Sequence, residues 1–450
     1  MTTYTPISHL MSQGRPDVYP VCSRLDATIS WLDFSTRVKA LAYGLQLRAE
    51  NRWLVSSPDA IEFSVQVLAL WHAGKQVVIP PNMQAGTLKD LASEYDAIVS
   101  NDMATLACDS FVFTPLISQA TFIDLYTSGS TGRPKRIRKT LAQFESEIDI
   151  LEALWGNKLG DCAIVATVPH HHIYGFIFRV LWPLSAGRVM DNVLCTDPEM
   201  LKNRLSAFKN AAIVSSPALL SRLPELAPLV SIISGTCTIF SSGGPLSKVA
   251  AFAFDQQLGY SPIEVYGSTE TGGIAWRKQL IDEAWTPFVG VKLANIEGTA
   301  TLASPFLADA LPKVIDDAIE LLSDGCFHLL GRIDRIVKIE EKRLSLPDME
   351  SLLLKHSWIK AAAAVALASR KQSVGVAIEL TKEGQSILAQ HGRRHVIQLL
   401  KVYLAQYFDK VLLPRYWRFV KQLPMSAQGK LTSAAVHALF SPEDNHHAVT

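Results

Sequence analysis

The sequence of 450 residues contains no long hydrophobic run and no apolar segment behind a basic N-terminus. Its longest run of small apolar residues, 361–368, is far too short to cross a bilayer. The N-terminal segment also lacks the basic stretch and apolar core of a secretory signal. We therefore expect a cytoplasmic protein without stable insertion in a membrane.

Paired cysteines and an excess of charge are missing as well. The six cysteines, at positions 22, 108, 162, 195, 237 and 326, form no CxxC pair and no metal-ligand spacing, which fits a reducing compartment better than a disulfide framework. Lys and Arg number 43 against 42 Asp and Glu, so the formal net charge of +1 gives no reason to expect a nucleic acid as partner. An anionic ligand would have to be held by a local site.

Apolar residues are abundant: 48% of the chain is hydrophobic and 19% is charged, enough for a core of two or three domains. From about residue 57, β-branched runs alternate with helical patterns. The runs lie at 76–80, 96–100, 122–127, 162–168, 211–216, 237–242 and 263–267, and the helical patterns at 58–73, 141–155, 173–186 and 246–258. Because parallel strands need crossovers, this order predicts an α/β fold with parallel sheets flanked by helices, and ligand groups after the carboxyl ends of strands.

The alternation fades near residue 290, where 291–306 predicts a small antiparallel β region. After GRIDR (331–335) come a further strand (AAAAVALA) and a helix at 394–407. We expect a large N-terminal domain over 1–331 and a small, mobile α+β C-terminal domain over 332–450, with a hinge near Asp334 and a disordered tail in the last ten residues.

The sharpest local feature is TSGSTGRPK, directly after a strand. It combines hydroxyl side chains, two glycines and a lysine, so it offers many donors and a close backbone approach to a polyphosphate. Its candidate residues are Thr127, Ser128, Gly129, Ser130, Thr131, Gly132 and Lys135. The glycine spacing differs from that of a Walker loop and no Ser or Thr follows the lysine, which argues against a P-loop kinase. An ordinary Ser/Gly turn is the alternative.

A second loop, YGSTETGG, follows the strand at 263–267. Tyr266 beside the flexible Gly267 can stack on a purine, and the Glu270 carboxylate with the Thr269 hydroxyl can hold Mg²⁺, which prefers oxygen ligands. The alternative is a capping turn in which Thr269 or Glu270 satisfies a helix N-terminus.

Three further segments contain candidate residues. Neighbours on extended backbone point to opposite faces, so the three consecutive histidines of PHHHIYG argue against a zinc site, and His172 either lines a pocket or is structural. Asp317 and Arg332 could clamp a ribose, although such charges are more often surface ion pairs. Lys430, in LPMSAQGK, is either functional or a solvated lysine.

In their order along the chain, six segments resemble the core motifs of the adenylate-forming ANL superfamily, which includes acyl-CoA synthetases, adenylation domains of peptide synthetases and luciferases. These segments are LYTSGSTGRPK, PHHHIYG, SSGGPLS, VYGSTETGG, GRIDRIVKI and LPMSAQGK. The resemblance covers about residues 57–440. It implies an enzyme that makes an acyl-AMP from a carboxylic acid and MgATP, releases pyrophosphate and transfers the acyl group to a thiol.

The resemblance also assigns roles. It implies that the hydroxyl-rich loop binds the β- and γ-phosphates of ATP, that Tyr266 lies against adenine, that Thr269 contacts the α-phosphate and that Glu270 holds Mg²⁺. Asp317 and Arg332 would bind the ribose. Lys430 would bridge the acid and the α-phosphate, after which rotation about Asp334 would admit the thiol.

The chemistry fits these residue types. A carboxylate that attacks a phosphate is an anion meeting an anion, so positioning and electrostatic neutralisation by magnesium and lysine lower the barrier. The residues expected around the acid, which suit a flat aromatic or a medium acyl group, are His172, Tyr174, Ser216, Gly243, Gly244 and Gly267. Gly243 and Gly244 are also expected to belong to the nucleotide site, and His172 to the catalytic residues.

Some positions depart from the family pattern. The usual Thr-Gly-Asp reads Ile315, Asp316, Asp317, so the choice of Asp317 over Asp316 for the ribose depends on register. Glu341 stands where many members have a glycine in the thiol tunnel, which favours an acyl carrier protein over free CoA as acceptor. The resemblance is to compact bacterial ligases that load acids onto such carriers. A non-catalytic homologue that binds nucleotide is a further alternative.

Overall fold

The computed structural model divides into two compact units. Unit 1 comprises Met1–Asn295, Thr301–Lys313 and Leu321–His328, and unit 2 comprises Ile296–Ala300, Val314–Glu320 and Leu329–Thr450. The residues that the structure describes are 4–25, 27–82, 85–104, 110–128, 134–223, 235–281, 283–296, 299–308, 311–332, 335–339, 342–367, 373–408, 410–425 and 431–440. The predicted hinge at Asp334 and the predicted disordered tail fall outside these ranges, and the boundary at 331/332 stays a prediction.

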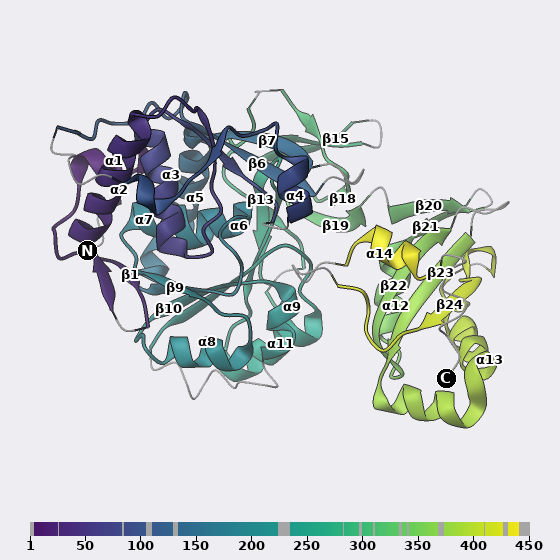
Figure 1. Ribbon diagram of the computed structural model, residues 1–450. Helices are drawn as coiled ribbons and strands as arrows, with labels where there is room; N and C mark the ends of the chain where they lie inside the picture. The colour runs from purple at the N-terminus through teal and green to yellow at the C-terminus, as the bar shows by residue number, and fades with distance from the viewer. Residues whose placement is uncertain are drawn as a thin grey trace. The chain divides into compact units, whose positions relative to one another are not determined.

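A nine-stranded sheet forms the larger layer of unit 1 (Figure 1). Its order is β14 (Thr286–Pro287), β13 (Gly272–Arg277), β12 (Ile263–Ser268), β11 (Cys237–Ser241), β10 (Ala211–Ser215), β8 (Ala163–Ala166), β9 (Met190–Leu194), β1 (Pro20–Ser23) and β2 (Thr28–Ser30). The strands from β12 to β1 pair in parallel, whereas β13, β14 and β2 are antiparallel to their neighbours. The order of the parallel strands differs from their order along the chain, as expected for strands joined by crossovers.

Helices cover both faces of this sheet. On one face, Ile213 and Ile239 pack with residues of α8 (Pro198–Leu205), α9 (Pro217–Leu220) and α11 (Lys248–Leu258), and Figure 1 shows these helices together. On the other face, the ring of Phe240 contacts Trp155 of α5 (Leu141–Leu159) and Trp182 of α7 (Trp182–Ala186). Because successive strand residues point to opposite faces, the apolar runs of the sequence serve both layers.

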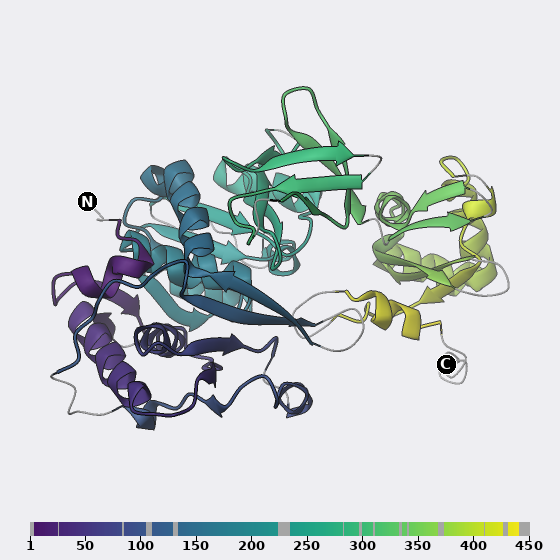
Figure 2. The ribbon, with the colours of Figure 1, turned by 90° about the horizontal axis from the view of Figure 1, so that it is seen from above.

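A five-stranded sheet forms the second layer of unit 1. Its order is β5 (Ala97–Ile98), β3 (Arg52–Leu54), β4 (Gln76–Ile79), β6 (Phe122–Ser128) and β7 (Pro134–Thr140). All pairs are parallel except β6 and β7, which form a long antiparallel ribbon (Figure 2). The other α-helices among the described residues of unit 1 are α1 (Ile7–Gln13), α2 (Trp31–Gln46), α3 (Ala60–His72), α4 (Ala85–Asp90) and α6 (Ile173–Gly175).

The helix starts follow capping chemistry. Ser30 with Asp33 and Thr140 with Gln143 form capping boxes at α2 and α5, in which each side chain accepts from the other residue's backbone N–H. The pattern at 173–186 is not one α-helix, because Phe176–Leu181 forms a π-helix between α6 and α7. An insertion of this kind widens the turn without changing the apolar character of the segment, so periodicity does not reveal it.

Two small sheets are formed by the residues between 292 and 332, which the two units share. One small sheet has the order β15 (Lys292–Ile296), β16 (Thr299–Ala303) and β17 (Lys313–Val314), and another pairs β18 (Asp317–Leu321) with β19 (Phe327–Arg332). This is the β region expected from 291–306.

Unit 2 has its own hydrophobic core. Its sheets are β20 (Ile336–Ile339) with β21 (Lys342–Ser345), and β22 (Ile359–Leu367), β23 (Ser373–Leu380) and β24 (Tyr416–Phe419) in that order. Met349 and Leu353 of α12 (Leu346–Leu354), Leu400 of α13 (Lys382–Leu404) and Trp417 of β24 pack together in this core. The helix α14 (Ser433–Ala438) completes the described part.

The predicted α/β class is confirmed: a large domain of mainly parallel sheets, covered by helices, accompanies smaller sheets. The helix expected at 394–407 corresponds to the second part of α13, after Gly392, and the part that begins at Lys382 with Thr381 as its N-cap was not predicted. Gly392, at φ 75° and ψ 167°, interrupts that helix. Along the described ranges, no helix is both long and apolar enough to span a bilayer.

Candidate functional site

The hydroxyl-rich segment joins two antiparallel strands. Thr127 in β6 is opposite Lys135 in β7, and Ser128 is opposite Pro134. This register places Lys135 at the beginning of β7, beside the end of β6. The remaining predicted phosphate-binding residues of the segment, Gly129, Ser130, Thr131 and Gly132, and the Ser128 side chain lie outside the described residues.

The second segment forms the tip of the hairpin between β12 and β13. The Ser268 backbone N–H donates to the Thr271 hydroxyl over 3.0 Å, and the Thr271 N–H donates to the Ser268 hydroxyl over 3.2 Å. These bonds close a turn that presents Thr269 and Glu270. A Cβ added at Gly267 would lie 2.3 Å from the Gly272 carbonyl oxygen, so the two strands can approach this closely only with glycine.

An ion pair connects the two hairpins. Lys135 Nζ lies 3.0 Å from Glu270 Oε1, and the lysine is largely exposed whereas the carboxylate is partly buried. Burial would raise the pKa of Glu270, but the Lys135 ammonium and hydrogen bonds outweigh it, and the pKa is lowered. The carboxylate is therefore ionised at neutral pH and faces the strand that follows the hydroxyl-rich segment. The sequence reasoning proposed both residues but not their contact.

Lys139, further along β7, was not identified from the sequence. Its side chain is only 3% exposed, and Nζ donates to the carbonyl oxygens of Glu270 at 3.0 Å and Phe306 at 2.8 Å. Burial lowers its pKa. Gln143 Nε2 donates to the same Phe306 oxygen over 2.9 Å. A buried ammonium thus fixes the backbone of Glu270, and one lysine among several basic residues of a strand gives no sequence signal for this role.

Glu147 of α5 was also missed. It is 5% exposed, and its Oε1 accepts from the Gly273 N–H over 3.0 Å. Burial raises its pKa. The sequence signal was available but weak: Glu147 lies in the helix register with Phe144, Ile148 and Leu151, on a face that is mainly apolar.

A cavity of about 40 Å³ adjoins this hairpin. Its lining residues, which come from α5, α6, the π-helix and the ends of β11 to β13, are Glu147, Ile173, Tyr174, Ile177, Phe178, Ser242, Val265, Gly267, Ser268, Gly272 and Gly273. Tyr174 and Gly267 belong both to this lining and to the predicted acid pocket. The other predicted pocket residues, His172, Ser216, Gly243 and Gly244, are not in the lining.

His172 begins α6 at its N-cap position, and its ring contacts that of His171 at 4.5 Å between centroids. The neighbouring His170 is a structural residue, since its Nε2 lies 2.8 Å from the Ser57 carbonyl oxygen in a buried position. Gly243, at φ 89°, and Gly244 are exposed after β11. Of the described histidines, cysteines and carboxylates, no three or more group as a metal site.

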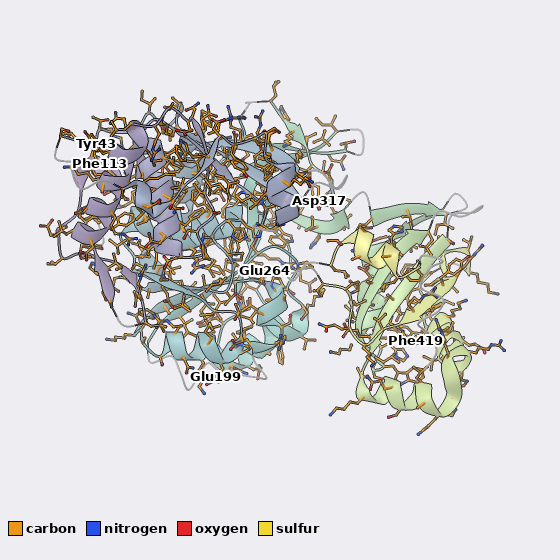
Figure 3. The ribbon with its side chains drawn as sticks, in the orientation of Figure 1. Tyr43, Phe113, Glu199, Glu264, Asp317 and Phe419 are labelled. Atoms are coloured by element: carbon orange, nitrogen blue, oxygen red, sulfur yellow. The ribbon has the colours of Figure 1, made fainter. Side chains whose placement is uncertain are left out.

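Tyr266 lies at the end of β12, where its ring contacts those of Trp285 at 5.6 Å and Phe327 at 6.1 Å between centroids. Asp317 begins β18 in unit 2 and is labelled in Figure 3, whereas Arg332 ends β19, also in unit 2. Lys430 and Glu341 lie outside the described residues. An isolated antiparallel bridge pairs Met425 with Leu431 on the two sides of the Lys430 segment.

The buried carboxylate of Glu264 holds β12 in place, a few residues before the turn that presents Thr269 and Glu270. Glu264, labelled in Figure 3, pairs with Arg277 of β13 at 2.9 Å and accepts from the Leu246 N–H over 3.0 Å. Gln279 Nε2 donates to the same carboxylate over 2.7 Å. Because these contacts come from β13, from the segment after it and from the segment before α11, they fix β12, the strand that contains Tyr266.

Comparisons with known proteins show what the chain is similar to. Residues 114–299 match the family described as "AMP-binding enzyme". A 4-coumarate--CoA ligase from Cereibacter sphaeroides is 26% identical over 308 residues, which cover 68% of this chain and 69% of that protein. Bacitracin synthase 3 from Bacillus licheniformis is 23% identical over 87% of this chain, which spans only 6% of that protein's length.

The fold is shared with solved structures over nearly the whole chain. The crystal structure of ATP-bound MatB from Rhodopseudomonas palustris superposes with a TM-score of 0.81 over 97% of this chain and 99% of that chain, at 17% sequence identity. At this identity the likeness establishes the fold alone.

Proposed function

This chain carries the domain of AMP-binding enzymes within the fold of the adenylate-forming superfamily, and from this premise we propose that it activates a carboxylic acid with MgATP. The products are an acyl-AMP and pyrophosphate, and the acyl group then passes to a phosphopantetheine thiol. The observation that supports this most is the contact between Lys135 and Glu270, which brings together the two motif hairpins. One hairpin carries the hydroxyl-rich segment and the other carries the carboxylate.

The residue types at these hairpins match the charges of the reaction. A carboxylate that attacks the α-phosphorus forms a P–O bond while the bond to pyrophosphate breaks, and negative charge grows on the departing oxygens. Lys135 and the backbone donors of the hydroxyl-rich segment neutralise that charge, and Tyr266 offers a ring face to the adenine. Asp317 and Arg332 bind the ribose hydroxyls in this proposal. Lys430 bridges the attacking carboxylate and the α-phosphate.

Glu270 is the protein ligand that we propose for Mg²⁺. Its lowered pKa keeps it ionised, and Mg²⁺ is commonly bound by one or two carboxylates together with substrate phosphates and water. The ion would supply positive charge to the phosphate oxygens.

The experiment is acid-dependent exchange of labelled pyrophosphate into ATP. Lys430→Ala should lower the exchange rate by roughly 10²- to 10³-fold, as for loss of one preorganised donor, and Glu270→Gln should lower it to a similar extent. Lys421→Ala, a lysine of the same unit that has no proposed role, is the matched control and should exchange like the wild type. Wild-type exchange in Lys430→Ala would remove that lysine from the mechanism. ATP binding without pyrophosphate release over a broad panel of acids would instead identify a non-catalytic homologue.

An acyl carrier protein is the acceptor that we propose, with free CoA as the alternative. The support is Glu341, a carboxylate where the resemblance implies a glycine of the CoA tunnel. The test offers each thiol to the loaded enzyme and follows discharge of the adenylate. Discharge by CoA at the same rate as by a carrier protein would remove the argument from Glu341. Glu341→Gly, which opens that position, should increase the rate with CoA.

A further inference from the structure

The cavity beside the second hairpin contains one charged side chain among its lining residues, Glu147. This residue comes from α5, whereas the hairpin comes from β12 and β13, more than a hundred residues further along the chain. Its carboxyl group lies against the backbone of Gly272 and Gly273, and Oε1 accepts from the Gly273 N–H over 3.0 Å.

Two consecutive glycines make room for this carboxyl group. A Cβ added at Gly272 would lie 2.7 Å from Glu147 Oε2, and one added at Gly273 would lie 2.9 Å from Oε1. Gly272 also has φ 70°, which other residues rarely adopt. Any side chain at either position would fill the space that the carboxyl group occupies and would separate Glu147 from the cavity.

The rest of the lining is mainly apolar. Ile173, Ile177, Phe178 and Val265 supply hydrocarbon and one aromatic ring, and Tyr174 adds a second ring. Tyr174 and Phe178 lie 4.8 Å apart between ring centroids. The volume of about 40 Å³ favours a compact group over a long chain. A single acidic group in such a cavity decides what the cavity accepts, because a buried carboxyl group is costly without a hydrogen-bonding partner.

The nearby cation does not neutralise Glu147 by direct contact. Lys139 Nζ donates to the carbonyl oxygens of Glu270 and Phe306, both at 3.0 Å or less, and its charge acts on Glu147 from a distance. Burial disfavours the ionised form of Glu147 and raises its pKa. A ligand that donates a hydrogen bond to the carboxylate, or a cationic one, stabilises that form, whereas an anionic ligand does not.

We propose that Glu147 determines specificity in the acid pocket, and that the substrate is a compact carboxylic acid with a hydroxyl or amino group at the end remote from its carboxylate. This inference depends on the acid activation proposed above. The cavity is also lined by Gly267 and Ser268, the residues directly before Thr269 and Glu270. An acid oriented with its carboxylate toward Thr269 keeps that anion away from Glu147 and directs its remote donor at the carboxyl group.

The test is pyrophosphate release with matched acids that differ only in the remote group. The aromatic set is 4-methyl-, 4-hydroxy- and 4-aminobenzoate, and the aliphatic set is pentanoate, 4-hydroxybutanoate and 4-aminobutanoate. Wild-type kcat/KM should favour at least one donor-bearing acid over its methyl analogue by roughly 10⁴-fold, because a site built around a hydrogen bond rejects an analogue that lacks it. Within each set, comparison of the hydroxyl acid with the amino acid shows which donor the pocket prefers. Comparison of the two sets shows whether the pocket prefers an aromatic ring or an aliphatic chain.

The decisive variant is Glu147→Gln. It keeps the side-chain volume and the oxygen that accepts from Gly273, but it places an amide N–H₂ where the second carboxyl oxygen was. The preference for donor-bearing acids should fall at least tenfold, while ATP binding stays unchanged. Glu145→Gln, the same substitution on the same helix at a residue that does not line the cavity, is the matched control and should keep the preference.

The outcomes separate the two proposals. Pyrophosphate release from all acids of a set at equal efficiency would overturn the role of Glu147 and leave the acid activation intact. An unchanged preference in a folded Glu147→Gln would do the same. No release with any acid in the presence of MgATP would overturn the proposed function and this inference with it. The comparison of donor-bearing and methyl acids on the wild-type enzyme tests the proposed specificity even where Glu147→Gln does not fold.

Discussion

At the scale of single residues, Lys139 contacts two backbone carbonyls that come from different parts of unit 1. Its replacement by Met removes both hydrogen bonds and keeps most of the side-chain volume, which leaves two buried oxygens without this donor. We expect the free energy of unfolding to fall by about 2 kcal/mol, the typical cost of an unsatisfied buried acceptor. The rate of pyrophosphate release should also fall, because Glu270 loses its backbone anchor.

The measurement for Lys139→Met combines urea unfolding with steady-state kinetics. A positioning role predicts that kcat falls about tenfold while the KM for ATP changes less. The reason is that the Lys139 ammonium fixes the geometry of the reacting complex and not the affinity for ATP. Lys202→Met, at an exposed lysine of α8, is the control. An unchanged kcat in a destabilised Lys139→Met would show that the residue is structural only.

The distribution of sequence signals explains why this part of the site was missed. Thr127, Lys135, Tyr266 and Glu270 stand in short segments whose composition is unusual, so a sequence pattern finds them. Lys139 and Glu147 stand at single positions in a strand and a helix, and their roles come from burial against Glu270 and Gly273. Burial of that kind depends on which elements pack together, which a single sequence does not specify.

At the scale of elements, the same reasoning predicted strands better than helix details. The strand at 122–127 corresponds to β6, and the run at 211–216 to β10, because β-branched runs bounded by breakers have few alternatives. The π-helix at Phe176–Leu181 was missed because it leaves the apolar character of the segment unchanged. The helical part of α13 before Gly392 was not predicted, whereas the part after it corresponds to the helix expected at 394–407.

The segment that leads into α6 is joined to the π-helix by His170. Its Nε2–H donates to the Ser57 carbonyl oxygen at 2.8 Å, and Nδ1 faces the Arg179 guanidinium at 3.4 Å. A second proton would therefore lie on Nδ1, against a cation in a buried site. Burial and then Arg179 lower the pKa of His170 to about 3, while Ser57 and Asp59 act in the opposite direction and His171 adds to the lowering.

This pKa predicts how stability depends on pH. The unfolded chain binds a proton on this histidine below about pH 6.5, whereas the folded protein does so only near pH 3. The stabilisation is complete above pH 6.5 and is lost as the pH falls from 6.5 toward 3. At pH 5 the loss is about 2 kcal/mol relative to pH 7, from 1.36 kcal/mol for each pH unit below the unfolded value.

Urea unfolding at pH 7 and pH 5 measures the sign and size of the contribution of His170 to the free energy of unfolding. His170→Gln keeps a donor for the Ser57 oxygen but does not titrate, so its unfolding free energy should fall by about 2 kcal/mol less than that of the wild type over this range. His72, whose pKa burial lowers to about 4, contributes equally to both proteins and cancels in the comparison. Identical pH dependence of the two proteins would contradict the account of His170.

At the scale of the whole molecule, the charges of the chain are divided unevenly. Residues 332–450 carry 18 Lys and Arg against 10 Asp and Glu, a formal charge of +8, whereas residues 1–331 carry 25 against 32, a formal charge of −7. The net charge of +1 hides this division. CoA and an acidic carrier protein are both anionic. If either is the thiol acceptor, as proposed above, we expect the C-terminal segment to attract it.

Electrostatic attraction of this kind weakens with salt, because the Debye length falls from about 10 Å at 0.1 M to about 3 Å at 1 M. We predict that kcat/KM for the thiol acceptor falls about tenfold between 50 and 300 mM KCl, whereas the rate of acid-dependent pyrophosphate release at saturating substrates changes less than twofold. Arg394→Glu, an exposed residue of α13, should reduce kcat/KM at low salt and flatten its salt dependence. Lys209→Glu, an equal charge change at an exposed residue of unit 1, should affect the acceptor less. Equal effects of the two variants would show that the net charge of the whole chain, and not that of its C-terminal segment, governs the encounter with the acceptor.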